Sequence, residues 1–161
     1  MDEVIWLDPL SIRYKIAPKL DGIRAGDWDI ERRHEFAETV KAQSIRLHFV
    51  DGADWRETEL FSRVYAKRLK DEGRVGQWRT LDDLAREYVR RYDGLFLRLK
   101  RDGFKTDDGN GRNYPLPSLL IGRDGEVFIG NQGNHRLAMA QILRLDKIAG
   151  KITCRHQSWT P

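Results

Sequence analysis

The most constraining feature of the sequence is an apolar run that passes through a glycine-containing polar loop into a helical pattern. Val127–Ile129 is the apolar run, and residues 137–143 have the composition of a buried helix. The loop between them consists of Gly130, Asn131, Gln132, Gly133, Asn134, His135 and Arg136. This order predicts a strand that ends in a glycine turn, followed by a helix that begins with His135 and Arg136.

The start of such a helix is an anion site for two physical reasons. The first backbone N–H groups have no partners within the helix, and the helix dipole places partial positive charge there. Gly130 and Gly133 allow the backbone to approach a ligand closely or to adopt positive φ. Arg136 adds a forked charged donor and His135 a titratable group, so the loop suits phosphate. The alternative is a tight turn in which both side chains only stabilise their own fold.

The segments around this loop resemble the ParB/sulfiredoxin superfamily. Residues 119–129 have the pattern of a hairpin with an Asp124–Gly125 turn, and residues 146–154 that of a loop and a final strand. Residues 4–12 are similar to the superfamily's opening strand and proline-containing turn. Residues 133–136 match its Gly-x-His-Arg motif, which begins a helix and binds nucleotide phosphates. The resemblance covers roughly residues 3–16 and 93–156.

The resemblance implies an α+β fold, with a small mixed β-sheet of the ParB/sulfiredoxin type and a helix that begins at the Gly-x-His-Arg motif. Residues 1–161 are expected to form a single domain, with a helical insertion at about residues 30–105. The insertion has no counterpart in the minimal domain of the superfamily. Within it, we expect helices at residues 30–43 and 58–70, and a third that is capped by Thr80 and ends near Gly103.

The function implied by the resemblance is nucleotide binding, with ATP-dependent phosphotransfer to a small hydroxyl compound or nucleotide hydrolysis as the activity. The cofactors are then ATP or another nucleoside triphosphate together with Mg²⁺, which bridges the phosphates. The partners are the nucleotide and a small-molecule acceptor. The alternative function is that of a non-catalytic module that senses a nucleotide or binds nucleic acid or a partner protein.

Three departures from the superfamily limit the activities that can be transferred. Sulfiredoxin carries a catalytic cysteine where this chain has Asn134, and the single cysteine, Cys154, lies on the expected last strand. Gln132 stands where kinase-like members often have aspartate. The helix-turn-helix domain of chromosome-partitioning ParB proteins has no counterpart after the expected last strand. Sulfinic-acid reduction through a cysteine at position 134 is therefore excluded.

The candidate catalytic residues are His135 and three acids outside the motif. Asp27 and Asp29 flank Trp28, and Glu126 precedes the strand that leads into the loop. Two acids so close to each other suit Mg²⁺ binding or general-base chemistry. The alternative for Asp27 or Asp29 is to cap a helix that begins near Glu31, and for Glu126 simply to face solvent. No metal ligands are assigned, because none of the four histidines has helical zinc-motif spacing.

Composition bounds the remaining possibilities. The net charge is +4, and residues 60–105 hold 13 Lys or Arg against 7 Asp or Glu. Acids interrupt this basic stretch, so binding to nucleic acid is disfavoured. No apolar run approaches the ~20 residues that span a bilayer, so we expect no membrane partner. An acidic start that runs into a strand and a lone cysteine favour a cytoplasmic location. Trp6, Trp55 and Trp78 are expected to pack in the interior.

Overall fold

The structure, a computed structural model, describes residues 3–161. Within that range seven strands form one mixed sheet in the order β1-β7-β5-β6-β2-β4, with β3 also paired to β7. Its strands are β1 (Val4–Leu7), β2 (Tyr14–Ile16), β3 (Gly22–Arg24), β4 (Arg33–Glu35), β5 (Ser118–Ile121), β6 (Val127–Ile129) and β7 (Ile148–His156). The longest strand, β7, is the centre of one half of the sheet, because β1 and β3 pair with successive parts of it while β5 pairs along its other edge.

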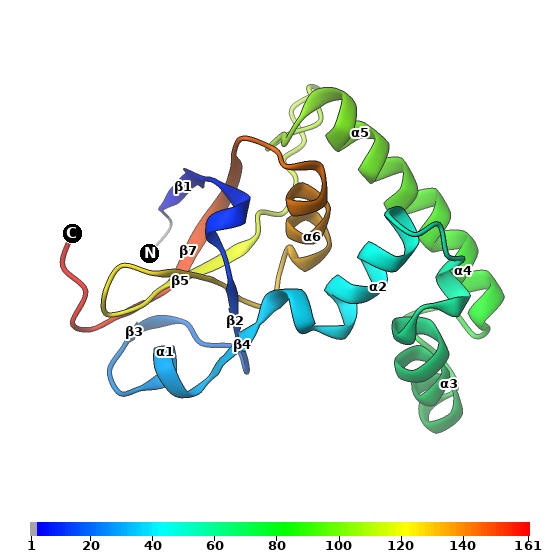
Figure 1. Cartoon of the computed structure of the whole chain (residues 1–161), viewed down its shortest axis with the longest axis horizontal. Helices are drawn as coiled ribbons and strands as arrows, with labels where there is room; N and C mark the ends of the chain where they lie inside the picture. The colour runs from blue at the N-terminus through cyan, green and yellow to red at the C-terminus, as the bar shows by residue number, and fades with distance from the viewer. Residues whose placement is uncertain (1–2) are drawn as a thin grey trace.

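Most of the helices belong to the insertion. The α-helices of the described chain are α1 (Trp28–Glu31), α2 (Val40–Phe49), α3 (Ala66–Glu72), α4 (Leu81–Tyr88), α5 (Gly94–Asp102) and α6 (Asn134–Leu143). Of these, α2 to α5 lie within the insertion. Figure 1 shows α6 against the sheet, with α2 to α5 extending away from it on the right. Two π-helical segments, η4 (Leu60–Tyr65) and η5 (Val89–Asp93), lead into α3 and α5. Among the described residues, no helix is both long and apolar enough to cross a membrane.

The hairpin and the strand–loop–helix order expected from the sequence are confirmed. β5 and β6 are antiparallel neighbours, and Gly125 turns the chain between them with φ +84°. Gly125 N–H closes this turn by donating to the Gly122 carbonyl at 3.1 Å. α6 then leads back to β7, which runs parallel to β5. The observed architecture is therefore α+β with a mixed sheet.

The two faces of the sheet carry cores of different size. Leu119, Ile129 and Ile152 belong to the larger core on the helix side, with Leu137 and Met139 of α6. The smaller core on the opposite face contains Ile16, Trp28, Leu120, Phe128 and Cys154. Successive side chains of a strand point to opposite faces, so neighbours such as Leu119 and Leu120 are divided between the cores. The helices of the insertion, between residues 40 and 102, add their buried side chains to the larger core.

The expectation of one helix over residues 30–43 is wrong for the first part of that range. The chain instead forms the single turn α1, the strand β4 and a 3-10 turn, η2 (Phe36–Glu38), before α2 begins. β4 pairs antiparallel with β2, and a bidentate pair between Arg13 and Glu35 supports that pairing at 2.7–3.3 Å. The partner strand lies about 20 residues earlier in the chain, so helical spacing in the local sequence could not reveal it.

The other insertion helices form as expected. Residues 60–70 of the expected helix at 58–70 fall within η4 and α3, and α4, η5 and α5 continue one another from residue 81 to residue 102. Thr80 caps α4, because its hydroxyl accepts from Asp83 N–H at 3.1 Å. Gly94 lies inside this run without ending it, whereas Gly103, with φ +75°, ends α5.

The tryptophans divide between interior and surface. Trp55 is buried, and its indole N–H donates to Asp93 at 3.0 Å. Trp78 is half-buried against the larger core. The expectation for Trp6 is wrong, since it is 51% exposed and makes an edge contact with Phe104. Val4 and Trp6 are exposed while Ile5 and Leu7 are half-buried, so the face of β1 that carries Trp6 is toward solvent.

Candidate functional site

The loop before α6 is held tightly against β5. Gly130 N–H donates to the Ser118 carbonyl at 2.8 Å, and Gln132 N–H donates to the Ser118 hydroxyl at 3.0 Å. Gly133 has φ +84°, and a Cβ there would lie 2.5 Å from Pro117. Both the backbone conformation and the close approach therefore require glycine at this position. Asn134, which is buried, donates its amide to the Gly130 carbonyl at 2.9 Å and thus serves the loop itself.

His135, the second residue of α6, turns toward the helical insertion. Its ring stacks on Tyr92 with 4.1 Å between centroids and 8° between planes. Its Nε2 lies 3.3 Å from the Tyr88 hydroxyl, which in turn lies 2.5 Å from the Tyr65 hydroxyl. Burial, with the added charges of Lys41 and Arg91, lowers the pKa of His135 to about 3. The imidazole is therefore neutral at pH 7 in the free protein.

Arg136 turns the other way, toward the segment that precedes β5. Its guanidinium donates to the Lys105 carbonyl at 2.7 Å and to the Pro115 carbonyl at 2.9 Å. It also covers the Phe104 ring, with 3.8 Å from Cζ to the centroid. Arg136 is thus used by the fold, as the tight-turn alternative anticipated, and its donors are already partly occupied.

The charges of Lys41 on α2 and Arg91 on η5 act on His135, and those of Lys15 on β2 and Arg68 on α3 act in turn on Lys41; we call these four residues the cationic cluster. Burial lowers the pKa of Lys41, and the neighbouring charges of Lys15 and Arg68 lower it further. Burial also lowers the pKa of Lys15. The cluster therefore gathers positive charge from β2, α2, α3 and η5 around Lys41, which itself acts on His135 in the first turn of α6.

None of the four Lys and Arg side chains of the cationic cluster has an acidic partner within ion-pair distance among residues 3–161. The contrast with the rest of the surface is clear, since Arg63, Lys67 and Arg90 each pair with an acid one turn away. Half-burying two lysines beside each other has an unfavourable free energy that no carboxylate offsets. A bound anion would offset it.

The two π-helical segments contribute several of the side chains near His135. Tyr65 ends η4, while Arg91 and Tyr92 belong to η5. A π-helical turn adds a residue to a helix and so shifts which side chains face the interior. Helical spacing in the sequence places Tyr88 and Tyr92 in the core, but it gives no sign that their rings meet His135. No local pattern in the sequence indicates that Lys15 and Lys41 lie near each other, because they belong to different elements, β2 and α2.

The predicted catalytic acids are assembled elsewhere. The Arg123 guanidinium lies 2.7 Å from both Asp27 and Asp29, and Asp29 is buried. Burial alone would raise the pKa of Asp29, but hydrogen bonds and the charge of Arg123 outweigh it and lower that pKa to about 2. Asp27 occupies the N-cap position of α1, but its carboxylate makes no capping hydrogen bond and is bound to Arg123 instead. Glu126 pairs with Arg33 at 3.4 Å.

These acids lie at the turn end of the β5–β6 hairpin, whereas the loop of residues 130–136 follows the other end of β6. Three residues of strand separate the two ends, a span of roughly 10 Å. The structure therefore brings Asp27 and Asp29 together but does not bring Asp27, Asp29 or Glu126 to His135. The role of Arg123 was not anticipated from the sequence, because it lies 94 positions from Asp29.

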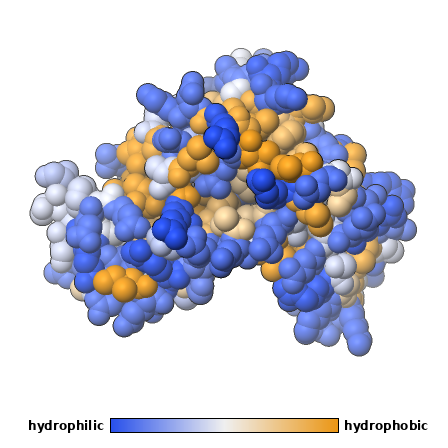
Figure 2. All heavy atoms as spheres, viewed as in Figure 1, coloured by the Kyte–Doolittle hydropathy of each residue, from blue (hydrophilic) through white to orange (hydrophobic). Residues whose placement is uncertain are grey.

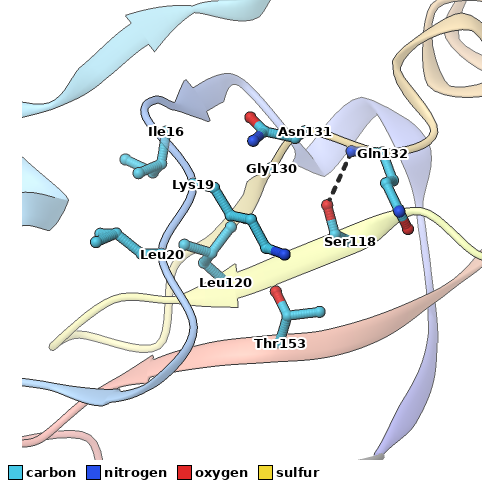
Figure 3. A pocket seen from close by; sticks show the side chains of 9 residues that line it. All are labelled: Ile16, Lys19, Leu20, Ser118, Leu120, Gly130, Asn131, Gln132 and Thr153. Atoms are coloured by element: carbon cyan, nitrogen blue, oxygen red, sulfur yellow. Dashed lines mark hydrogen bonds between the residues drawn. The ribbon is translucent and has the colours of Figure 1, made fainter.

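The same loop also borders a pocket of about 130 Å³ on the opposite face of the sheet. Its lining includes Gly130, Asn131 and Gln132 from the loop and Lys19 from the segment after β2. Figure 3 shows the Lys19 side chain extending across this pocket toward β5 and β7. Two distinct surfaces therefore meet at residues 130–135, one on each face of the sheet.

Neither a protein-bound metal centre nor a relative identifies the site. Within residues 3–161 no group of three or more His, Cys, Asp or Glu side chains is arranged to hold a metal ion. Comparisons with protein-family models, with curated proteins and with solved structures find no match. A functional assignment must therefore come from the chemistry of the site.

Proposed function

We propose that this protein binds the phosphate groups of a nucleotide in the cationic cluster at the first turn of α6. The single observation that carries the proposal is the pair of half-buried lysines, Lys15 and Lys41, without an acidic partner in the described chain. A fold keeps such an arrangement at a cost in stability, as functional sites commonly do. We propose in addition that the sheet is of the ParB/sulfiredoxin type and that the protein is cytoplasmic.

Several features favour a polyphosphate over a single small anion. The cationic cluster holds two lysines and two arginines and draws them from four different elements. The first N–H groups of α6 and the helix dipole act in the same direction. Tyr92, half-buried on the His135 ring, offers an aromatic surface beside the charges. Mg²⁺ would be held by the phosphates together with water, since no protein metal centre is required for that role.

Phosphotransfer to a small hydroxyl compound is the activity that the superfamily resemblance implies, and it is the second part of the proposal. The chemistry would need an acid to orient the acceptor hydroxyl. Asp29 is neutralised by Arg123, and Glu126 is held by Arg33. Asp27 keeps a largely exposed carboxylate, so it is the acid best able to meet an acceptor. The geometry supports nucleotide binding more directly than it supports catalysis.

The test is nucleotide binding by wild type and by Lys41→Met, measured by titration calorimetry with ATP and with CTP in the presence of Mg²⁺. Methionine keeps the length of the side chain and removes its charge. Losing a charged hydrogen bond to phosphate should weaken binding by about tenfold or more. The melting temperature of the free variant should stay the same or rise, because a half-buried unpaired charge is removed.

The matched control is Lys70→Met, on the exposed side of α3. This variant should bind nucleotide like wild type. Equal affinity in Lys41→Met, Lys70→Met and wild type would contradict the proposal, as would the absence of binding by wild type. A melting temperature well below that of wild type in Lys41→Met would assign Lys41 to the fold instead of to a ligand.

A further inference from the structure

We propose that the pocket on the opposite face of the sheet binds a small carboxylate with a short apolar tail. This pocket is lined by Ile16, Lys19, Leu20, Ser118, Leu120, Gly130, Asn131, Gln132 and Thr153. It does not share lining residues with the cationic cluster. Strand alternation separates the two sites, since Lys15 reaches Lys41 on the helix face while Ile16 belongs to the smaller core on the other.

The polar side of the pocket is suited to one carboxylate group. Lys19 provides the only cationic side chain of the lining, and it has no acidic partner among the described residues. In Figure 3 its ammonium group extends toward the hydroxyls of Ser118 and Thr153. The Ser118 hydroxyl already accepts from Gln132 N–H, which leaves its own hydrogen to donate. An ammonium group and a hydroxyl are two donors, which matches the two oxygens of a carboxylate.

The other side of the pocket is apolar. Ile16 and Leu120 belong to the smaller core, and Leu20 is packed partly against it. These three aliphatic side chains suit a hydrocarbon tail and disfavour a compact, fully charged phosphate ion, which would lose hydration without gaining partners there. The pocket thus has a charged end and an apolar end.

The volume limits the length of the tail. The pocket offers about 130 Å³. An engineered protein cavity of ~150 Å³ holds benzene, a molecule of six carbon atoms. A ligand of about that size fits, which corresponds to a carboxylate with a tail of two or three carbons. We therefore choose butyrate as the probe.

The experiment is a titration of methyl-labelled protein with butyrate, followed by the NMR shifts of Ile16, Leu20 and Leu120. The methyl signals of these three residues should move together and saturate. Lys19→Met should weaken butyrate binding by about tenfold or more, because it removes a charged donor. Thr153→Val, which keeps the shape and removes a hydroxyl, should weaken binding less, since that hydroxyl already makes a long 3.4 Å bond to the Leu119 carbonyl.

Three comparisons decide the result. Butylamine, with the opposite charge, and inorganic phosphate, without a tail, should both bind more weakly than butyrate. Lys41→Met should leave butyrate binding unchanged, so failure of the nucleotide site and failure of this pocket are separable. Lys19 is exposed, so the Lys19→Met variant should keep its melting temperature. Saturable shifts that persist unchanged in Lys19→Met, equal binding of butylamine, tighter binding of phosphate, or no shifts at all would each overturn the proposal.

Discussion

Two residues of this protein carry buried or half-buried charges in opposite environments, one paired and one unpaired. Asp29 is buried, and Arg123 meets it with side-chain and backbone donors at 2.7–3.2 Å. Lys41 is half-buried, and the charges that act on it are those of the cations Lys15 and Arg68. A buried ion pair serves the fold, whereas a buried unpaired charge destabilises it unless a ligand arrives. Asp29 and Glu126, two of the acids that looked functional in the sequence, are thus held in ion pairs, and the lysines that looked ordinary are the better candidates for function.

His135 allows a direct test at this scale. Its pKa is about 3 in the folded protein, against an ordinary value of 6.5. Because the folded pKa is depressed, the unfolded chain binds the proton more readily between these two values. The stabilising contribution is complete above about pH 6.5 and is lost as the pH falls toward 3, by about 1.4 kcal/mol per pH unit. We therefore expect wild type to lose stability on acidification already between pH 6 and pH 4.5.

His135→Gln should remove that part of the slope, measured as the free energy of unfolding in urea at several pH values. The absolute stability of the variant is expected to drop, because the ring contact with Tyr92 is lost, but only the slope tests the assignment. His34→Gln, at an exposed position of β4, is the control and should keep the wild-type slope. A His135→Gln slope identical to that of wild type between pH 6 and pH 4.5 would show that His135 is not buried in a neutral form.

At the scale of elements, α6 organises its surroundings through residues that point in opposite directions. His135 reaches the helical insertion, and Arg136 reaches the segment of residues 104–115. That segment has few regular backbone bonds of its own, among them Tyr114 N–H to the Thr106 carbonyl at 2.8 Å. The helix start therefore contacts both the insertion and the connection that follows it.

Arg136→Met should loosen residues 104–115 without unfolding α6. The methionine keeps an apolar contact with Phe104 but loses both hydrogen bonds to backbone carbonyls, which we expect to lower the free energy of unfolding by about 1–3 kcal/mol. The amide of Tyr114 should exchange with solvent faster, as measured by hydrogen exchange. Arg98→Met, an exposed change on α5, is the control. Unchanged exchange at Tyr114 together with a loss of nucleotide affinity would restore Arg136 as a phosphate ligand.

At the scale of the whole molecule, the positive charge of the insertion is spread over a solvated surface. Figure 2 shows hydrophilic residues covering most of α3, α4 and α5, on the right of the view. Several of these cations pair with acids on their own helix, among them Arg63, Lys67, Arg86 and Arg90. Local pairing reduces the field that a distant polyanion would meet. This arrangement favours a small phosphate ligand in the cationic cluster over a nucleic acid laid across the insertion.

We therefore expect no measurable binding to duplex DNA at physiological salt. A protein that grips duplex phosphates releases counterions, so that log K falls with log salt by about 0.9 for each phosphate contact. Fluorescence anisotropy of a labelled duplex at two salt concentrations measures this slope. A folded Lys70→Gln/Arg98→Gln double variant separates the sites, since both residues are exposed on the insertion and lie outside the cationic cluster. Tight binding with a steep slope that this variant abolishes would make the insertion a nucleic-acid surface.

The sequence by itself determined the elements whose signals are local. The Asp124–Gly125 turn, the glycine loop before α6, the Thr80 cap and the final strand β7 all appear where the pattern placed them. Each depends on residues within a few positions of one another, through turn chemistry, capping or strand alternation. Local rules suffice there because the interacting groups are neighbours in the chain.

Only the tertiary structure decided which distant groups meet. It paired β4 with β2, gave Asp27 and Asp29 to Arg123, and left Trp6 on an exposed edge. It also brought the charges of Lys41 and Arg91 near His135, and that of Lys15 near Lys41, from three different elements. Burial and charge pairing are properties of the assembled fold, since the free energy of a charged group depends on neighbours from other elements. For that reason the loop was visible in the sequence, while the cations that give it a candidate function were not.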